Sequence, residues 1–317
     1  MQLLWIAGSL QLEEENAVQD FDPPVGIAEA LETDLRRILA PNPSPMTFRG
    51  TNTYILGTQD LAVIDPGPAS ESHLQAILAA EAPGQRITHI FVTHTHLDHS
   101  PLAKPLALAT GAPVLAFGAA TAGRSEIMQE LARAGDIGGG EGVDTDFTCD
   151  EVLQDGAQVA GSDWSLTALH TPGHIGNHMA FALGDLCFTG DHVMGWASSL
   201  VSPPDGDLTD FMASCEKLRA HPWRVFYPGH GPQVDTPSER LQWLIAHRHA
   251  REAAIKQVLA KAPATPEALA RAIYTDTPAA LLPAATRNVL AHLIDLMGKS
   301  KVDVTGKLSL DAPFFLL

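Results

Sequence analysis

Seven histidine and aspartate residues stand where short apolar runs end, and their side chains are of the types that bind divalent metal ions. The densest group lies in residues 93–100, THTHLDHS, and consists of His94, His96, Asp98 and His99. Three others follow in glycine-containing stretches (HTPGH, FTGD and YPGHG), namely His174, Asp191 and His230. Neutral imidazole and carboxylate are ligands that zinc and similar ions prefer. With 14 histidines in 317 residues, three within six positions indicate a metal site and not a chance cluster.

Short apolar runs bounded by Gly, Pro, Asp or His predict the strands that position these residues. They are TNTYILG, LAVIDPG, ITHIFVTH, APVLAFG, WSLTALHTPGH, MAFALGDLCFTGDH and RVFYPGHG, each read as a strand that ends in a loop. Helical spacing appears between some of them, in residues 70–82, 101–111 and 208–220. This succession indicates a mixed α/β or layered α+β domain. The Gly- and Asp-rich residues 134–146 are expected to form a mobile loop between two halves.

The pattern changes near residue 237, where helix-spaced apolar residues replace the strand-length runs. A helix capped by Ser238 is expected first, a second opens at Thr265-Pro266, and a third covers residues 284–298. Two alternating segments about a Thr-Gly turn, KVDVTGKLSL, then predict a β-hairpin. Three helices and a hairpin are the order of a winged-helix module. We therefore expect a catalytic domain over residues 1–237, with roughly the first 25 residues as an N-terminal extension, and a winged-helix-like domain over residues 238–317.

Composition excludes several classes of protein. A content of 45% hydrophobic and 18% charged residues is not that of a disordered, collagen-like or coiled-coil chain. The three cysteines are far apart and form no CxxC pair, so neither a disulfide framework nor a zinc finger is indicated. No uninterrupted apolar stretch reaches the roughly 18 residues of a transmembrane helix, and the N-terminus lacks the basic region of a signal peptide. We expect a cytoplasmic protein without a membrane partner.

The charge distribution bears on nucleic-acid binding. The formal net charge of −17 argues against a protein that coats nucleic acid through phosphate contacts. From residue 240 onward, however, 10 Lys and Arg face 6 Asp and Glu, a net charge of +4. If this tail bound RNA, phosphate contacts would come from Arg248, Arg251, Lys256, Arg287, Lys299 and Lys301. The favoured alternative is that the tail packs on the metal domain or mediates dimerisation; the sequence does not determine the oligomeric state.

The order HxHxDH, TPGH, TGD and PGHG, over roughly residues 50–232, resembles the metallo-beta-lactamase superfamily, close to its glyoxalase II-like branch. The resemblance implies an α+β fold, a four-layer αββα sandwich with a two-metal site at one edge. It assigns to the first metal His94, His96 and His174. It assigns to the second metal Asp98, His99 and His230, with Asp191 bridging the two. It also implies two zinc ions (alternatively Fe or Mn), a metal-bridging hydroxide as nucleophile, and Asp98 and Asp191 as the catalytic carboxylates.

Two positions narrow the reaction that the resemblance implies. Diiron oxygen-reducing relatives typically carry Glu where this chain has His96, which favours a hydrolase. The best-known zinc β-lactamases place a Cys near the position of Asp191, which argues against hydrolysis of β-lactam drugs. The segments PNPSPMT and GTNTY, at residues 41–47 and 50–54, resemble the beta-lactamase-like-protein-2 group, which has a small C-terminal winged-helix-like domain.

The sequence therefore predicts a metal-dependent hydrolase that cleaves a small-molecule ester or thioester. Some members of the group cut single-stranded RNA, so an RNA endonuclease is one alternative. A persulfide dioxygenase that holds a single iron through His94, His174 and Asp191 is another. A regulator that binds nucleic acid through the winged helix is the third. His192, beside Asp191, could donate a proton to the leaving group or be a simple loop histidine.

Overall fold

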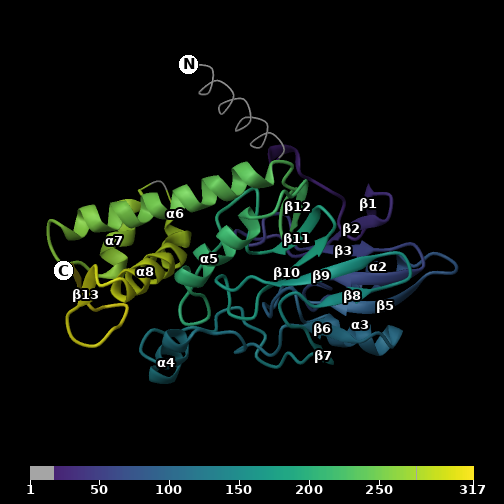
Figure 1. Ribbon diagram of the computed structural model, residues 1–317, viewed down its shortest axis with the longest axis horizontal. Helices are drawn as coiled ribbons and strands as arrows, with labels where there is room; N and C mark the ends of the chain where they lie inside the picture. The colour runs from purple at the N-terminus through teal and green to yellow at the C-terminus, as the bar shows by residue number, and fades with distance from the viewer. Residues whose placement is uncertain (1–17, 276) are drawn as a thin grey trace, which may run out of the picture.

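The computed structural model describes residues 18–275 and 277–317 and contains two mixed β-sheets (Figure 1). The larger sheet has, in spatial order, β1 (Glu29–Glu32), β2 (Leu35–Leu39), β3 (Asn52–Leu56), β4 (Asp60–Ile64), β5 (Arg86–Phe91), β6 (Val114–Ala116) and β7 (Glu151–Val152). The smaller sheet has the order β12 (Val225–Pro228), β11 (Leu186–Gly190), β10 (Met179–Leu183), β9 (Ser165–His170) and β8 (Gln158–Ala160). The strand pairs β4–β5, β5–β6, β6–β7 and β11–β12 are parallel, and the others are antiparallel.

Alternation along the strands produces the layers, because successive side chains point to opposite faces of a sheet. On the larger sheet, Tyr54 and Phe91 pack against the smaller sheet in a shared core with Phe181. Ile55 and Ile90, their sequence neighbours, pack on the opposite face against α2 (Glu71–Ala79) and α3 (Ala103–Thr110).

The outer face of the smaller sheet is covered in the same way. Cys187 and Phe226 pack against α5 (Leu208–Arg219) and the first half of α6 (Pro237–Leu259). The order helix, sheet, sheet, helix confirms the predicted four-layer αββα sandwich of the α+β class.

The C-terminal segment forms a cluster of helices at one end of the molecule (Figure 1). It comprises the second half of α6, α7 (Pro266–Ile273), the 3₁₀ helix η1 (Ala279–Leu281), α8 (Leu282–Gly298) and the pair β13 (Val302–Val304) and β14 (Phe314–Leu316). Leu269, Val289 and Phe314 belong to its own buried core, which also takes in Met128 of α4 (Glu126–Ala134). Thr265 caps α7 by accepting from the Ala268 N–H, as the sequence predicts.

Several predicted elements differ from the structure. Helix α6 begins at Pro237, and its cap position is Thr236, so the predicted Ser238 cap is wrong. The run at residues 179–192 is two strands, β10 and β11, joined at Gly184, where φ is +58°. The predicted hairpin exists, but its second strand is Phe314–Leu316 and not the LSL segment, so its turn is longer. Strands β1, β2, β7 and β8 and helix α4 were not predicted from the sequence.

Residues 134–146 are not a free connection between halves. The Leu97 N–H donates to the Gly142 carbonyl at 2.8 Å, and the Asp144 N–H donates to the Thr95 carbonyl at 2.7 Å. These bonds fix the segment to the histidine-rich loop. Most of the predicted N-terminal extension lies outside the described residues. Among the helices of the described ranges, none has both the length and the apolar character needed to cross a membrane.

Candidate metal centre

All seven predicted ligand residues lie in loops at one edge of the sandwich. The loop after β5 carries four of them, the loop between β9 and β10 carries His174, and Asp191 and His230 follow β11 and β12. Because β11 and β12 are parallel neighbours, their carboxyl ends meet at the same edge. Gly229 makes the close approach possible, since a Cβ there would lie 2.5 Å from Asp191 Oδ1 and 2.6 Å from His99 Cε1.

The seven side chains form two adjoining groups. In the first, His96 Nδ1 lies 2.9 Å from His94 Nε2 and 3.0 Å from His174 Nε2. In the second, His230 Nε2 lies 3.1 Å from Asp98 Oδ2 and 3.3 Å from His99 Nε2. Each group offers three ligand atoms within 4.8 Å of one another.

Asp191 lies between the two groups. Its Oδ2 is 3.3 Å from His230 Nε2 and 3.8 Å from His174 Nε2, and its Oδ1 is 3.4 Å from His99 Nε2. Within the described chain, Oδ1 is buried without a hydrogen-bond donor, an arrangement that costs free energy unless a cation or donor satisfies it. Asp191 thus presents a buried carboxylate to the histidines of both groups.

In His174 and His230, the hydrogen bond made by one ring nitrogen determines which nitrogen is left to bind a metal. His174 Nδ1 faces the Leu200 carbonyl at 2.6 Å, and His230 Nδ1 faces the Gly50 carbonyl at 3.1 Å. A carbonyl only accepts, so each Nδ1 carries an N–H, and Nε2 is the nitrogen that faces the interior and can bind a metal once it carries no proton. Lone pairs converging on one point fit a cation, and the residues present therefore suit a divalent metal.

Asp65 also belongs to the site, although it was not predicted from the sequence. Its Oδ2 lies 2.8 Å from His99 Nδ1, and it also accepts from Thr93 through the N–H at 2.7 Å and the hydroxyl at 2.8 Å. Since the Thr93 hydroxyl donates to Asp65, it accepts from His94 Nδ1, which is 2.9 Å away. One buried carboxylate thus orients two of the predicted ligands, His99 directly and His94 through Thr93. The available signal was an acid directly after the buried run LAVI, followed by Pro-Gly.

The histidines of the first group have lowered pKa values, whereas those of the second group have raised ones. Burial lowers the pKa of His94 and His174, and that of His96 to about 3, so these rings are neutral at pH 7. Burial also acts against a charge on His230, but the carboxylates of Asp191 and Asp98 outweigh it and raise the pKa to about 9.

Neighbouring charges also outweigh burial at His99 and Asp191. Burial would lower the pKa of His99, yet Asp98, Asp191 and Asp65 together hold it well above its usual value. Burial would raise the pKa of Asp191, but His230 and His99 keep it well below its usual value. Without a cation, protons on His99 and His230 thus balance the carboxylates.

Metal binding is expected to release protons and to strengthen as pH rises. The raised pKa of His230 stabilises the metal-free fold fully below pH 6.5, and this contribution is lost as pH rises through about 9. Between these values, the thermal midpoint of the loaded protein should increasingly exceed that of the metal-free protein. Thermal unfolding of both forms at pH 6.5 to 9 measures this difference. A constant difference, with no proton release in titration calorimetry, would contradict the prediction.

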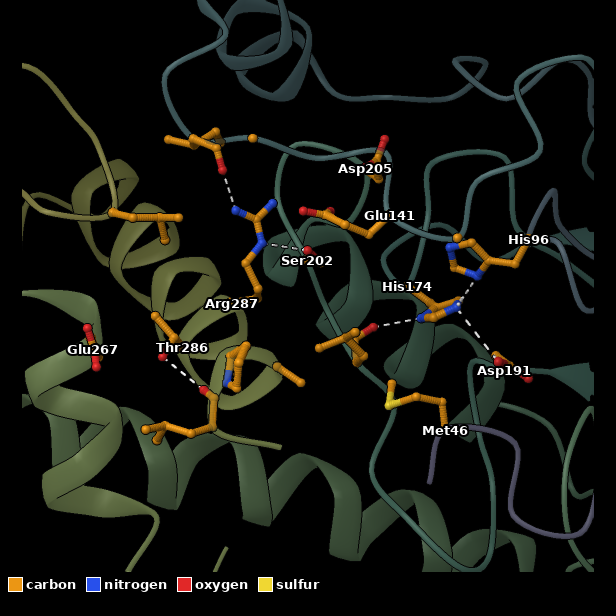
Figure 2. A pocket seen from close by; sticks show the side chains of 18 of the residues that line it. Met46, His96, Glu141, His174, Asp191, Ser202, Asp205, Glu267, Thr286 and Arg287 are labelled. Carbon is orange, nitrogen blue, oxygen red and sulfur yellow. Dashed lines mark hydrogen bonds and ion pairs between the residues drawn. The ribbon is translucent and has the colours of Figure 1, made fainter. Parts of the chain in front are cut away.

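A cavity of about 950 Å³ opens at the ligands (Figure 2). His96, Asp98, His174 and Asp191 line one end of it. Figure 2 shows Thr286 and Glu267, from the C-terminal helices, at the other end. His192 does not reach this space, because its side chain is buried with Nε2 3.5 Å from the Cys215 sulfur. It is therefore not placed to donate a proton to a leaving group.

The basic residues of the C-terminal segment bind the chain itself. Arg248 is buried and donates to the Ser199 carbonyl and to Asn288 Oδ1. Arg287 donates to the carbonyls of Ile137 and Pro203 and, at 2.8 Å, to the Ser202 hydroxyl.

These contacts hold the loop after Asp191, in which the Ser199 hydroxyl donates to the Asp191 carbonyl at 2.5 Å. Arg251 donates to the Ile273 carbonyl, and Lys256 and Lys299 pair with Glu252 and Asp295. Five of the six candidates for phosphate contacts are thus engaged within the chain.

Known protein families match both the sandwich that carries the candidate metal centre and the C-terminal segment. Residues 46–230 match the metallo-beta-lactamase superfamily, and residues 265–309 match the beta-lactamase associated winged helix domain. The chain is 29% identical over 304 residues to the Beta-lactamase-like protein 2 homolog of Drosophila melanogaster, with 90% of this chain and 94% of that protein covered. It is 32% identical over 245 residues to an atrochrysone carboxyl ACP thioesterase of Aspergillus fumigatus, with 75% of this chain and 67% of that protein covered.

The fold likeness extends over nearly the whole chain. A beta-lactamase domain protein from Burkholderia ambifaria has a TM-score of 0.77 at 18% identity, covering 94% of this chain and 96% of that one. The expected winged-helix domain and the resemblance to the beta-lactamase-like-protein-2 group are confirmed. This chain belongs to the metallo-beta-lactamase superfamily and is a metal-dependent hydrolase with the associated winged helix domain.

Proposed function

We propose that the protein is a two-zinc hydrolase that cleaves a small-molecule ester or thioester. The observation that carries the proposal is Asp191, whose two carboxylate oxygens face the histidines of both groups. In this proposal the first ion is held by His94, His96 and His174, and the second by Asp98, His99 and His230. Asp191 would serve both ions. Imidazole and carboxylate donors without a thiolate suit zinc, and they also accept iron or manganese.

Two bound divalent ions would activate a water molecule as nucleophile and polarise the carbonyl oxygen of the substrate. Side chains of the protein would position the water molecule and the metal-binding rings. Asp98 lines the cavity, its side chain is 26% exposed, and one oxygen is held near His230. A carboxylate so placed can orient the attacking water and accept its proton. Hydrogen bonds from Nδ1 hold three of the histidine rings in place. The acceptors are the Leu200 carbonyl, the Gly50 carbonyl and the Asp65 carboxylate, for His174, His230 and His99 respectively.

Several observations favour acyl-group hydrolysis over the alternatives. The Aspergillus fumigatus relative is a thioesterase by name. A single-iron dioxygenase would use His94, His174 and Asp191, and would leave the convergence of Asp98, His99 and His230 without a purpose. An RNA endonuclease would need cations for phosphates, whereas the arginines nearest the site are engaged with backbone carbonyls.

We also propose the division into residues 1–237 and 238–317. Helix α6 begins at this boundary and serves both parts. Leu241 and Leu244 pack with the smaller sheet, whereas Ile255 and Leu259 pack in the C-terminal core. The two parts therefore share one continuous helix.

Purified protein is expected to hold two zinc ions per chain and to hydrolyse activated esters and thioesters. A chelator should remove both the metal and the activity, because the nucleophile depends on the ions, and added zinc should restore them. Serine- and thiol-directed reagents should have no effect. Metal analysis beside a screen of thioesters, esters and single-stranded RNA tests this. One iron per chain with sulfur oxygenation, or RNA cleavage without ester turnover, would contradict the proposal.

A further inference from the structure

The cavity at the metal centre continues well beyond the ligands, to a far end built by the C-terminal module. Apolar side chains of this end are Ile137, Ala279, Leu282, Pro283, Ala284 and Leu310. Figure 2 shows Arg287 and Thr286 of α8 on the side of the pocket opposite His96 and Asp191. We propose that this end, called the far pocket, binds the long arm of the substrate, an uncharged and largely apolar chain or ring system. The inference rests on the proposed ester or thioester hydrolysis.

The size of the cavity requires more than a small acyl group. About 950 Å³ lies at the upper end of the range of roughly 300–1,000 Å³ for small-molecule sites. An acetyl-sized substrate at the metals would leave the far pocket to water against apolar walls. Each further methylene group that displaces this water gains binding free energy. The shape of the cavity therefore favours an elongated substrate.

The geometry of α8 explains how the C-terminal module becomes a wall of the site. Ala285 and Val289 face the buried C-terminal core. Ala284 and Arg287 are three residues apart and so share another face of the helix. Arg287 binds the loop at Ser202 and Pro203, beside the metal centre, which turns this face toward the cavity.

The charges of the far pocket exclude an anionic arm. Glu141 and Asp311 line it, and the described residues include no ion pair for either. Of the two lining arginines, Arg271 is paired with Glu267, and Arg287 donates to Ser202, Ile137 and Pro203. Acidic side chains outnumber arginines among the described lining residues, so a carboxylate or phosphate would enter a field of net negative charge, which is unfavourable at these short distances.

The first experiment is a chain-length series with the zinc-loaded wild-type protein. One set of 4-nitrophenyl esters lengthens the acyl group from acetyl to octanoyl, and one set of alkyl thioacetates lengthens the leaving group. In one of the two sets, kcat/KM is expected to rise about two- to fourfold per methylene, through KM. The responsive set identifies which side of the scissile bond occupies the far pocket. Flat profiles in both sets would overturn the inference.

Matched tryptophan variants locate the effect. Ala284→Trp, and Ala279→Trp at an exposed lining position, should each lower the octanoyl-to-acetyl (or octyl-to-methyl) ratio of kcat/KM about tenfold or more. Ala280→Trp is the control, because Ala280 is exposed in the same 3₁₀ helix and does not line the cavity. Equal ratios in all three variants would contradict the assignment.

A charge comparison completes the test. A succinyl ester should react at least about tenfold more slowly than the butanoyl ester, and Glu141→Gln should reduce this difference. A preference for the succinyl ester would overturn the inference. Failure of the proposed function looks different, since no ester or thioester in any series would then be hydrolysed in a zinc-dependent way.

Discussion

Asp191→Ala is expected to abolish ester and thioester hydrolysis and to remove metal from both positions. The oxygens of the Asp191 carboxylate reach His174 of the first group as well as His99 and His230 of the second. Without it, two dications would lie close together with no shared negative charge. We expect kcat/KM to fall by about a thousandfold or more. Metal content after dialysis and activity together measure the effect.

The control for this substitution is Asp185→Ala. Asp185 lies directly before the opposite end of strand β11, is largely exposed and pairs with Arg224 on the surface. It should keep two metals and full activity, because surface ion pairs contribute little to stability. Retention of two ions and of activity in Asp191→Ala would refute the assignment of Asp191.

Asp65→Asn is expected to weaken metal binding without unfolding the protein. The loss of charge removes the anionic partner of the His99 N–H and weakens the link through Thr93 to His94. Asparagine tolerates the left-handed backbone at this position, where φ is +52°, so the loop should keep its shape. Loss of such an outer partner typically costs about 10- to 100-fold in metal affinity. Competition titration with a chromogenic chelator measures the dissociation constants.

Excess zinc should restore most of the activity of Asp65→Asn, since its ligands remain present. Asp60→Asn is the matched control, because Asp60 begins the same strand and pairs with the surface residue Arg86. If Asp65→Asn bound zinc as tightly as the wild type, the role assigned to Asp65 would be wrong. If zinc bound normally but the thermal midpoint fell, Asp65 would be a structural residue only.

Local sequence determined the elements and the ligand types. Strand-length apolar runs fixed β3, β4, β5, β6, β9 and β12, because alternation of side chains is a local property of the chain. Thr265 and Pro266 fixed the start of α7 for the same reason. The histidine and aspartate residues were recognisable because imidazoles are rare and were clustered in strand-end loops.

Tertiary structure decided what depends on contacts between distant segments. The pairing of Val302–Val304 with Phe314–Leu316, across a loop in place of a tight turn, follows from the burial of Phe314 in the C-terminal core. Asp65 became a site residue only because parallel pairing of β4 and β5 brings its loop beside that of His99.

The roles of the C-terminal arginines and helices were decided in the same way. A sequence shows that Arg248 and Arg287 are charged, but not that they donate to backbone carbonyls of two loops that lie 49 to 150 residues away. The wall that α8 gives to the cavity likewise depends on how two cores pack. The periodicity of apolar residues shows which face of a helix or strand will be buried. It does not show against which element that face will pack, because this depends on contacts between segments distant in the sequence.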